Sequence, residues 1–371
     1  MAGMDHAGWE RYRGSSPLQR ADCGGEGSSR WSWPAQGSAM AELGGYGLQG
    51  LDRLRRPDAF VRAAEVMASL PERDRYERGE LLVPGLLLKS SGRLQEYYAP
   101  HNEIASSRAK VLIAGLTPGW RQMEISLRTM RRALLDGRDA PGACLMAKRE
   151  ARFAGSMRRD LLAMLERLGL PGKLAEWEAA ESAAREPAGK HSPASDGLAG
   201  SPAGLDGHEA ADGMKEQNSA AQAHLHFSAG EPFALLDHRL VHTTSVLPCP
   251  VFMDGANYSG HRPPLRRSPL LAEIMIGHMG TELSSMHKPL IIPLGRAVEE
   301  ALRLLAADGW LSEAQVLWGF PHPSGANGSR HSQFEAALPG MLERMRDFKP
   351  DFAYQSPAMG AERSLLNLEE L

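Results

Sequence analysis

Two glycine-rich segments, each at the end of an apolar run, carry the residues with the clearest chemical potential. The first is G-L-T-P-G at residues 115–119, and the second is G-F-P-H-P-S-G-A-N-G at residues 319–328. In the second segment His322 stands between two prolines. A histidine held in this way can donate a hydrogen bond to negative charge that develops on a leaving group. The alternative is that His322 only caps a turn.

The elements around these segments indicate how the two could meet. Four short apolar runs predict strands, at residues 110–115, 240–246, 289–295 and 315–319. Periodic apolar spacing predicts helices over 58–70, from 120 through 135, from 157, from 269, over 296–307 and over 332–347. Alternation of this kind favours a parallel sheet with helices on both faces, and ligands bind at the carboxyl ends of such strands. Both glycine-rich segments should therefore open at one edge of the sheet.

Composition limits the class of protein. The chain has 371 residues and a formal net charge of −3, which is not typical of a nucleic-acid-binding domain, although a local basic face remains compatible with it. The three cysteines, Cys23, Cys144 and Cys249, are too far apart for a disulfide framework or a four-thiolate metal site. The N-terminus has no apolar signal region, and no apolar run is long enough to span a membrane. We expect a cytoplasmic protein.

Glycine-, serine- and alanine-rich stretches divide the chain. Residues 1–50 are expected to form a disordered arm, 185–222 a disordered insert and 351–371 a tail. Residues 51–184 and 223–350 then form one domain. The insert's composition does not decide between a regulatory role and none.

The two glycine-rich segments resemble the signature motifs of the uracil-DNA glycosylase superfamily. R-F-A-G-S-M-R from Arg152, with the leucines after it, and P-L-I-I-P-L-G-R-A-V-E-E-A-L from Pro289 look like segments of the iron-sulfur branch of that superfamily. The likeness covers most of residues 105–347. It implies a three-layer α/β/α sandwich with a four-stranded parallel sheet. It also implies a hydrolase that flips a deaminated base out of DNA and cleaves its N-glycosidic bond.

Site roles follow from the resemblance position by position. His322 would stabilise the departing base, and the first loop would position water with Thr117. The expected base-binding residues are Gly115, Pro118, Gly119, Phe153 and Ser245, with Phe153 stacking on the base. The expected contacts to the DNA backbone are Ser324, Gly325, Asn327 and Arg330.

The sequence departs from the superfamily at several of these positions. Thr117 and Leu116 stand where members carry the catalytic acid or amide, Ser245 replaces the base-reading asparagine, and Cys249 matches only one of four cluster ligands. No iron-sulfur cluster or other cofactor is therefore expected. The alternative function is a nucleic-acid or nucleotide-binding module on the same fold that has lost catalysis.

The expected partner is DNA that carries a deaminated base. The protein is expected to be a monomer and not to bind a membrane. Local charge bears on the DNA binding. Eleven basic residues lie between Arg121 and Arg167, and Arg262, Arg266, Arg267 and Arg330 lie in loops expected at the same sheet edge. They predict a phosphate-binding face, with a solvated helix surface as the alternative. His224-x-His226 and His238-x-x-x-His242 have spacings that metal ligands use, but no acidic or cysteine partner completes a site, and no metal is expected.

Overall fold

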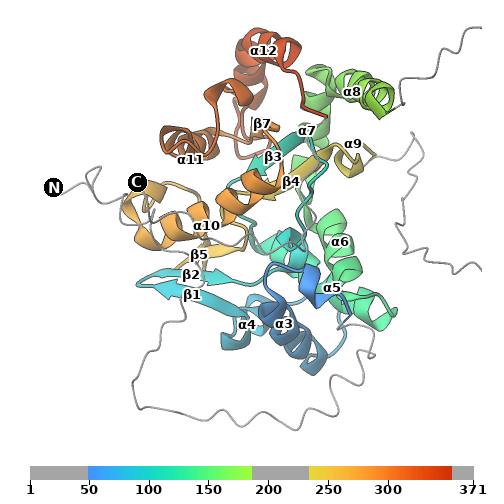
Figure 1. Cartoon of the computed structure of the whole chain (residues 1–371). Helices are drawn as coiled ribbons and strands as arrows, with labels where there is room; N and C mark the ends of the chain where they lie inside the picture. The colour runs from blue at the N-terminus through green and yellow to red at the C-terminus, as the bar shows by residue number, and fades with distance from the viewer. Residues whose placement is uncertain (1–48, 186–233, 353–371) are drawn as a thin grey trace, which may run out of the picture.

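The computed structural model of the chain describes residues 49–185 and 234–352. Its helices are α3 (Pro57–Ser69), α4 (Arg78–Leu81), α5 (Trp120–Leu135), α6 (Ala140–Ala151), α7 (Ser156–Arg167), α8 (Leu170–Arg185), α9 (Ala234–Asp237), α10 (Pro269–Ser285), α11 (Arg296–Ala307) and α12 (Arg330–Asp347). Its strands are β1 (Leu87–Ser91), β2 (Leu94–Tyr97), β3 (Val111–Gly115), β4 (Val241–Ser245), β5 (Val251–Met253), β6 (Ala256–Asn257) and β7 (Leu290–Pro293). Almost all of the predicted arm, insert and tail lies outside the described residues (Figure 1).

A parallel sheet of three strands organises one part of the molecule. Its order is β4-β3-β7, with Val111 of β3 opposite Val241 of β4 and Leu290 of β7. All three strands were predicted from their apolar runs. Ser268 begins α10 as expected, because its side chain accepts a hydrogen bond from the Leu271 amide.

The predicted fourth strand is wrong. Residues 315–319 run beside β7 but form a single parallel bridge, between Ile291 and Val316. Pro293 has no N–H to donate toward this neighbour, so the ladder cannot continue past the bond from the Leu317 amide to the Ile291 carbonyl. The Trp318 amide bonds the carbonyl of Val316 at 3.0 Å instead, which turns the segment away. The sequence shows Pro293, but it does not show that the missing N–H would have faced residues 315–319.

Helices cover both faces of the parallel sheet, as expected. Leu112 and Ala114 pack in one apolar cluster with α10 and α11, whereas Val111 and Ile113 pack in another with α7, α8 and α12. Adjacent residues face opposite ways because side chains alternate along a strand. Figure 1 shows these helices around β3, β4 and β7.

An antiparallel sheet that the sequence did not predict lies beside this assembly. Its order is β1-β2-β5-β6, and the β5–β6 hairpin turns at Asp254 and Gly255, with φ values of 48° and 74°. Positive φ at both positions is the two-residue turn for which Asp-Gly is favoured. Helices α3, α5 and α6 share a third apolar cluster with Phe252 of this sheet.

The two ends of the undescribed segment 186–233 are joined by a stem. Glu178 of α8 accepts a hydrogen bond from Arg239 Nε at 2.9 Å and lies 3.2 Å from His238 Nε2. Arg239 also pairs with Glu181. The chain thus leaves and re-enters the fold on either side of one ion-pair cluster.

Within the described ranges, no helix is both long enough and apolar enough to cross a membrane. Cys144 and Cys249 are free and buried.

Candidate functional site at the sheet edge

Four segments meet at the carboxyl edge of the parallel sheet, and we call them the sheet-edge site: 115–119, 245–251, 294–296 and 319–330. Gly115 pairs with Ser245, whose Oγ lies 3.5 Å from where a Cβ on Gly115 would stand. The Leu294 amide donates to the carbonyl of Ala114, and the Gly295 amide donates to that of Phe320. The prediction that the two glycine-rich segments open at the same edge is therefore confirmed by their positions.

Two glycines allow close packing at this edge. A Cβ on Gly295, where φ is 92°, would stand 2.8 Å from the Cβ of His322. A Cβ on Gly260 would stand 2.9 Å from the Leu116 side chain and 2.7 Å from that of Ala297. Larger residues at either position would push the loops apart.

His322 is held with its Nδ1 as an acceptor. The Ser324 amide donates to His322 Nδ1 at 3.3 Å, and Asn327 Nδ2 donates to the His322 carbonyl at 3.2 Å. Burial lowers the pKa of His322, so the ring is neutral at pH 7 and its proton lies on Nε2. The ring therefore presents one N–H donor.

Thr117 has a different setting from the one expected. Its hydroxyl donates to the Cys249 carbonyl at 3.0 Å and accepts from the Val251 amide at 3.2 Å. The side chain thus ties the first loop to the segment after β4. The only proton of this hydroxyl is therefore committed to the Cys249 carbonyl and cannot be donated to a water.

The rest of the first loop leads into α5. Pro118 is buried. The Gly119 amide donates a hydrogen bond to Gln122 Oε1, and the Trp120 amide donates one to Asn257 Oδ1 at 3.0 Å. Asn257 therefore satisfies part of the N-terminus of α5.

Phe153 does not present its ring to a ligand. It adopts φ 53°, is 5% exposed and packs in the cluster that contains Val111 and Ile113. Its loop does lie beside α5, because a Cβ on Gly155 would stand 3.0 Å from Arg121 Nη1. Stacking by Phe153 would need the ring to leave this core.

The expected DNA-backbone residues form the loop before α12. Ser324 and Asn327 are partly buried and Gly325 is exposed, but Asn327 Nδ2 also bonds Gln333 Oε1. Arg330 Nε donates to Asp160 at 3.1 Å. Arg330 is therefore already neutralised within the protein.

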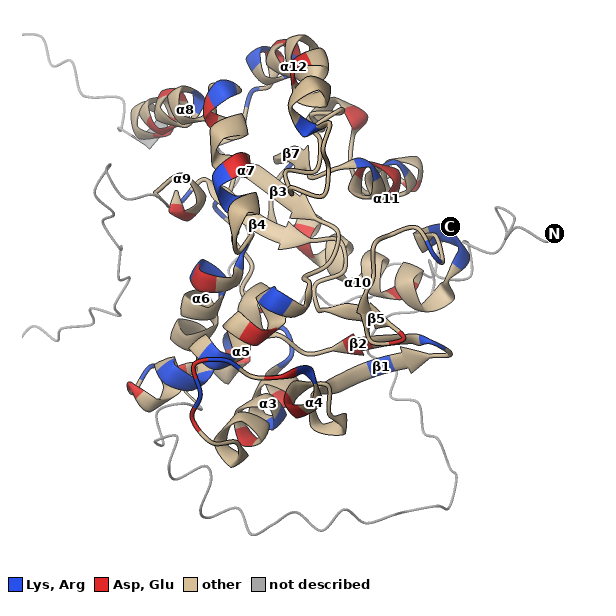
Figure 2. Cartoon of the chain, turned by 180° about the vertical axis from the view of Figure 1, so that it is seen from behind, with Lys and Arg blue, Asp and Glu red and all other residues tan. Residues whose placement is uncertain are grey.

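Most of the basic run from Arg121 to Arg167 serves the fold. The residues with internal partners are Arg128, Arg131, Lys148, Arg149, Arg152, Arg158, Arg159 and Arg167. Figure 2 shows both signs of charge interspersed along α5, α11 and α12. Glu124 of α5 is buried and accepts hydrogen bonds from Arg128 Nε and the Tyr76 amide. The exposed basic residues that remain near the sheet edge include Arg121 at the start of α5 and Arg262, Arg266 and Arg267.

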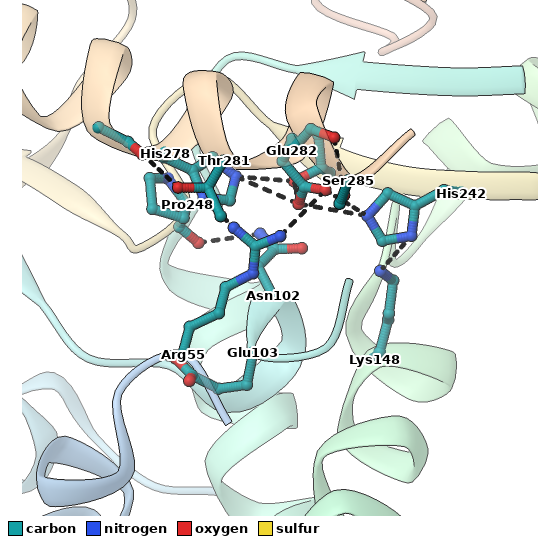
Figure 3. Close-up of polar contacts among 12 residues, drawn as sticks. Arg55, Asn102, Glu103, Lys148, His242, Pro248, His278, Thr281, Glu282 and Ser285 are labelled. Carbon is teal, nitrogen blue, oxygen red and sulfur yellow. Dashed lines mark hydrogen bonds and ion pairs between the residues drawn. The ribbon is translucent and has the colours of Figure 1, made fainter. Parts of the chain in front are cut away.

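A second polar cluster lies on the α10 side of β4, and we call it the Glu282 network (Figure 3). Its members are Arg55, Lys148, His242, Thr244, His278 and Glu282. Glu282 is 1% exposed and lies 3.2 Å from both His242 Nε2 and Arg55 Nη2. Thr244 Oγ1 lies 2.9 Å from His278 Nε2 and donates to Glu282 Oε1 at 3.1 Å.

Arg55 and Glu282 set the direction of the hydrogen bonds in the network. Arg55 Nη1 lies 3.3 Å from His278 Nδ1 and can only donate, so His278 Nδ1 accepts and its Nε2 carries the proton. The Glu282 carboxylate can only accept, so His242 Nε2 carries the proton and His242 Nδ1 accepts from Lys148 Nζ, 3.4 Å away. His278 then donates to Thr244, and His242 donates to Glu282.

This direction argues against a metal at the network. A metal needs an unprotonated ring nitrogen, so binding here would have to displace the protons on the Nε2 atoms that face Glu282. In the described part of the chain, no group of three or more His, Cys, Asp or Glu side chains is arranged to hold a metal ion. His224 and His226 lie outside the described residues.

Of this network, the sequence pattern singles out only His242, by its spacing from His238, and Lys148, within the basic run. The spacing of His278 and Glu282, four residues apart, was a usable signal, because it places both on one face of a helix. The spacing does not indicate that this face of α10 packs against β4.

Comparisons with known proteins place the chain in a family without assigning an activity. No protein-family model matches it, and no solved structure matches it. It is 33% identical over 281 residues to the uncharacterized protein YoxB of Bacillus subtilis (strain 168), an alignment that covers 75% of this chain and 90% of that protein. By that identity and coverage, the chain belongs to the YoxB family.

Proposed function

We propose that the protein binds DNA that carries a deaminated base and hydrolyses the N-glycosidic bond of that base. The observation that carries the proposal is the state of His322. A neutral ring with its proton on Nε2 can donate to a base that departs as an anion, and it stands at the same edge as Gly115 and Ser245.

In this proposal, Ser245 and the backbone of 115–119 bind the base, and a neutral His322 stabilises it. Ser245 is half-buried beside Gly115, which supports a role for its hydroxyl in bonding a polar base edge. Water attacks the sugar carbon as the bond to the base breaks, and the base takes the bonding electron pair. The proton that the water loses passes to solvent, and solvent protonates the released base anion. We assign Thr117 the role of joining the two loops.

A binding module without catalysis is the second candidate. It is favoured by the Thr117 hydroxyl, which is engaged by Cys249 and Val251 in the loop where a catalytic acid is otherwise expected. Such a module would keep the base pocket and leave the bond intact.

One assay separates the two candidates. Labelled oligonucleotides with uracil, hypoxanthine or xanthine, in single and double strands, are incubated with excess protein, and abasic product and binding are both measured. Abasic product on any substrate supports the glycosidase. Base-dependent binding without product supports the binding module. If neither abasic product nor base-dependent binding is found, both candidates are refuted.

A further inference from the structure

We propose that Thr244 and Glu282 are positioning residues, which fix the carboxyl end of β4 and, through it, the loops of the sheet-edge site. The inference deepens the proposed function, because it concerns what holds that site in place. It is carried by the bonds of the Glu282 network and by the backbone bonds that follow Ser245.

β4 needs support because it is an edge strand. It pairs with β3 on one side only, in a sheet of order β4-β3-β7. His242 and Thr244 project from the same face of the strand, and both bond the carboxylate of Glu282 on α10. Two side chains of one strand on a single buried acceptor fix both the register and the tilt of that strand.

Residues from the part of the fold around the antiparallel sheet also contact the Glu282 network. Arg55 lies just before α3 and Lys148 lies on α6, and both helices share an apolar cluster with Phe252 of the antiparallel sheet. Asn102 lies in the same region and donates to the Pro248 carbonyl at 2.9 Å. Figure 3 shows Arg55, Asn102 and Lys148 reaching α10 and β4 from that side. The end of β4 is therefore held between α10 on one side and Arg55, Asn102 and Lys148 on the other.

Backbone bonds carry this position to the first loop. The amides of Val246 and Leu247 donate to the carbonyls of Gly115 and Leu116, both at 2.8 Å. Beyond them, Cys249 and Val251 bond the Thr117 hydroxyl. A shift at Thr244 would thus move both the base-binding hydroxyl of Ser245 and the loop opposite.

A purely apolar contact would anchor the strand with a smaller desolvation cost. A directed network does something that apolar packing does not, because it accepts only one arrangement of donors and acceptors. For that reason, the conservative variant that keeps the hydroxyl should restore the arrangement, whereas one that keeps only the volume should not.

The test uses the full chain and four variants. Thr244→Val keeps the volume but removes the hydroxyl, Thr244→Ser keeps the hydroxyl, and Glu282→Gln keeps the shape but removes the charge. Thr281→Val is the matched control, because the exposed Thr281 hydroxyl only bonds the Gly277 carbonyl within α10. Hydrogen exchange at the Val246 and Leu247 amides is the direct readout.

We expect these two amides to exchange about tenfold faster in Thr244→Val, which removes a buried hydrogen bond, and in Glu282→Gln, which removes the buried charge that pairs with Arg55 and turns an amide donor toward that cation. Thr244→Ser and Thr281→Val should stay within about twofold of the unmodified chain. Exchange in α12 should be unchanged in every variant. Unchanged exchange at Val246 and Leu247, or an equal increase in α12, would overturn the inference.

The rate of base release is a second test of the positioning role, and the hydrogen-exchange result does not depend on it. If the unmodified chain releases a base, Thr244→Val should lower kcat about tenfold with little change in KM, and Thr244→Ser should restore it. If the unmodified chain releases no base, the proposed function fails while the exchange result still decides whether Thr244 and Glu282 position the loops.

Discussion

At the scale of single residues, the setting of His322 decides what the sheet edge can do. Its Nδ1 is occupied by the Ser324 amide, and burial keeps the ring neutral. Only Nε2–H remains to act on a ligand. The ring is therefore a donor and not a base.

His322→Ala should slow base release by at least about tenfold, because one hydrogen-bond donor to a developing anion is typically worth about 10² or more. Single-turnover rates on the best substrate measure this. His331→Ala is the control, because His331 is exposed in α12. A folded His322 variant with the control's rate would remove the residue from the mechanism.

Thr117→Val should cost about 1–3 kcal/mol in the free energy of unfolding, because it leaves the Cys249 carbonyl and the Val251 amide without their partner. Urea unfolding measures the loss, with Thr129→Val on α5 as the control. Thr117→Ser should recover most of it. Full stability in Thr117→Val together with lost activity would instead restore the expected role in positioning water.

At the scale of elements, the Glu282 network should make stability rise with pH in the acid range. Burial lowers the pKa of His278 to about 3 and also lowers that of His242. Burial alone would raise the pKa of Glu282, but His242, His278 and Arg55 hold it below its usual range. All three groups bind fewer protons in the folded chain than in the unfolded chain below about pH 6.5, so acid favours unfolding.

We therefore expect Tm to fall between pH 7 and pH 4. A loss of about 2 kcal/mol corresponds to roughly 4–8 °C in a domain of this size. His278→Gln removes one titrating ring and keeps an N–H donor, so its Tm should depend less on pH. Calorimetry across that range measures both, and parallel curves for the two proteins would contradict the assignment.

The elements that the sequence predicts best are those whose signal is local. The strand at Val111–Gly115 is a continuous apolar run, and α11 at Arg296–Ala307 has a clear apolar stripe, so both were found from pattern alone. Residues 315–319 have the same apolar signal, but their pairing depends on a donor that Pro293 lacks. The antiparallel sheet was missed because β1 is only half-buried to exposed and β5 and β6 are very short.

In the candidate site too, some features could be predicted from the sequence and others depend on contacts with distant residues. The loop positions of Gly115, Ser245 and His322 follow from strand order and the rule that carboxyl ends share an edge. The states of Thr117 and Phe153 do not, because each depends on a partner distant in sequence, such as Cys249 for the hydroxyl and Val111 for the ring.

At the scale of the whole molecule, net charge says little about DNA binding, whereas the position of the free cations says more. Arg262, Arg266 and Arg267 are exposed in the loop that passes Leu116 and Ala297 at Gly260. If they contact phosphates, DNA affinity should fall steeply as salt rises.

Replacing both Arg266 and Arg267 with alanine should lower the slope of log affinity against log salt by about 2. Fluorescence anisotropy at several salt concentrations measures the slope. Arg132→Ala, at the far end of α5 from the sheet edge, should leave it unchanged. Equal slopes for all three proteins would exclude this loop from the DNA contact.

The ion-paired stem between α8 and Arg239 bears on how this chain can vary in length. Because Glu178 and Glu181 hold the two ends together, the fold is closed at that point whatever connects Arg185 to Ala234. The entropy of closing a loop grows only slowly with its length. The connection is therefore a permissive insertion point, where evolution or an engineer can lengthen, shorten or replace the sequence while the carboxyl edge of the parallel sheet keeps its geometry.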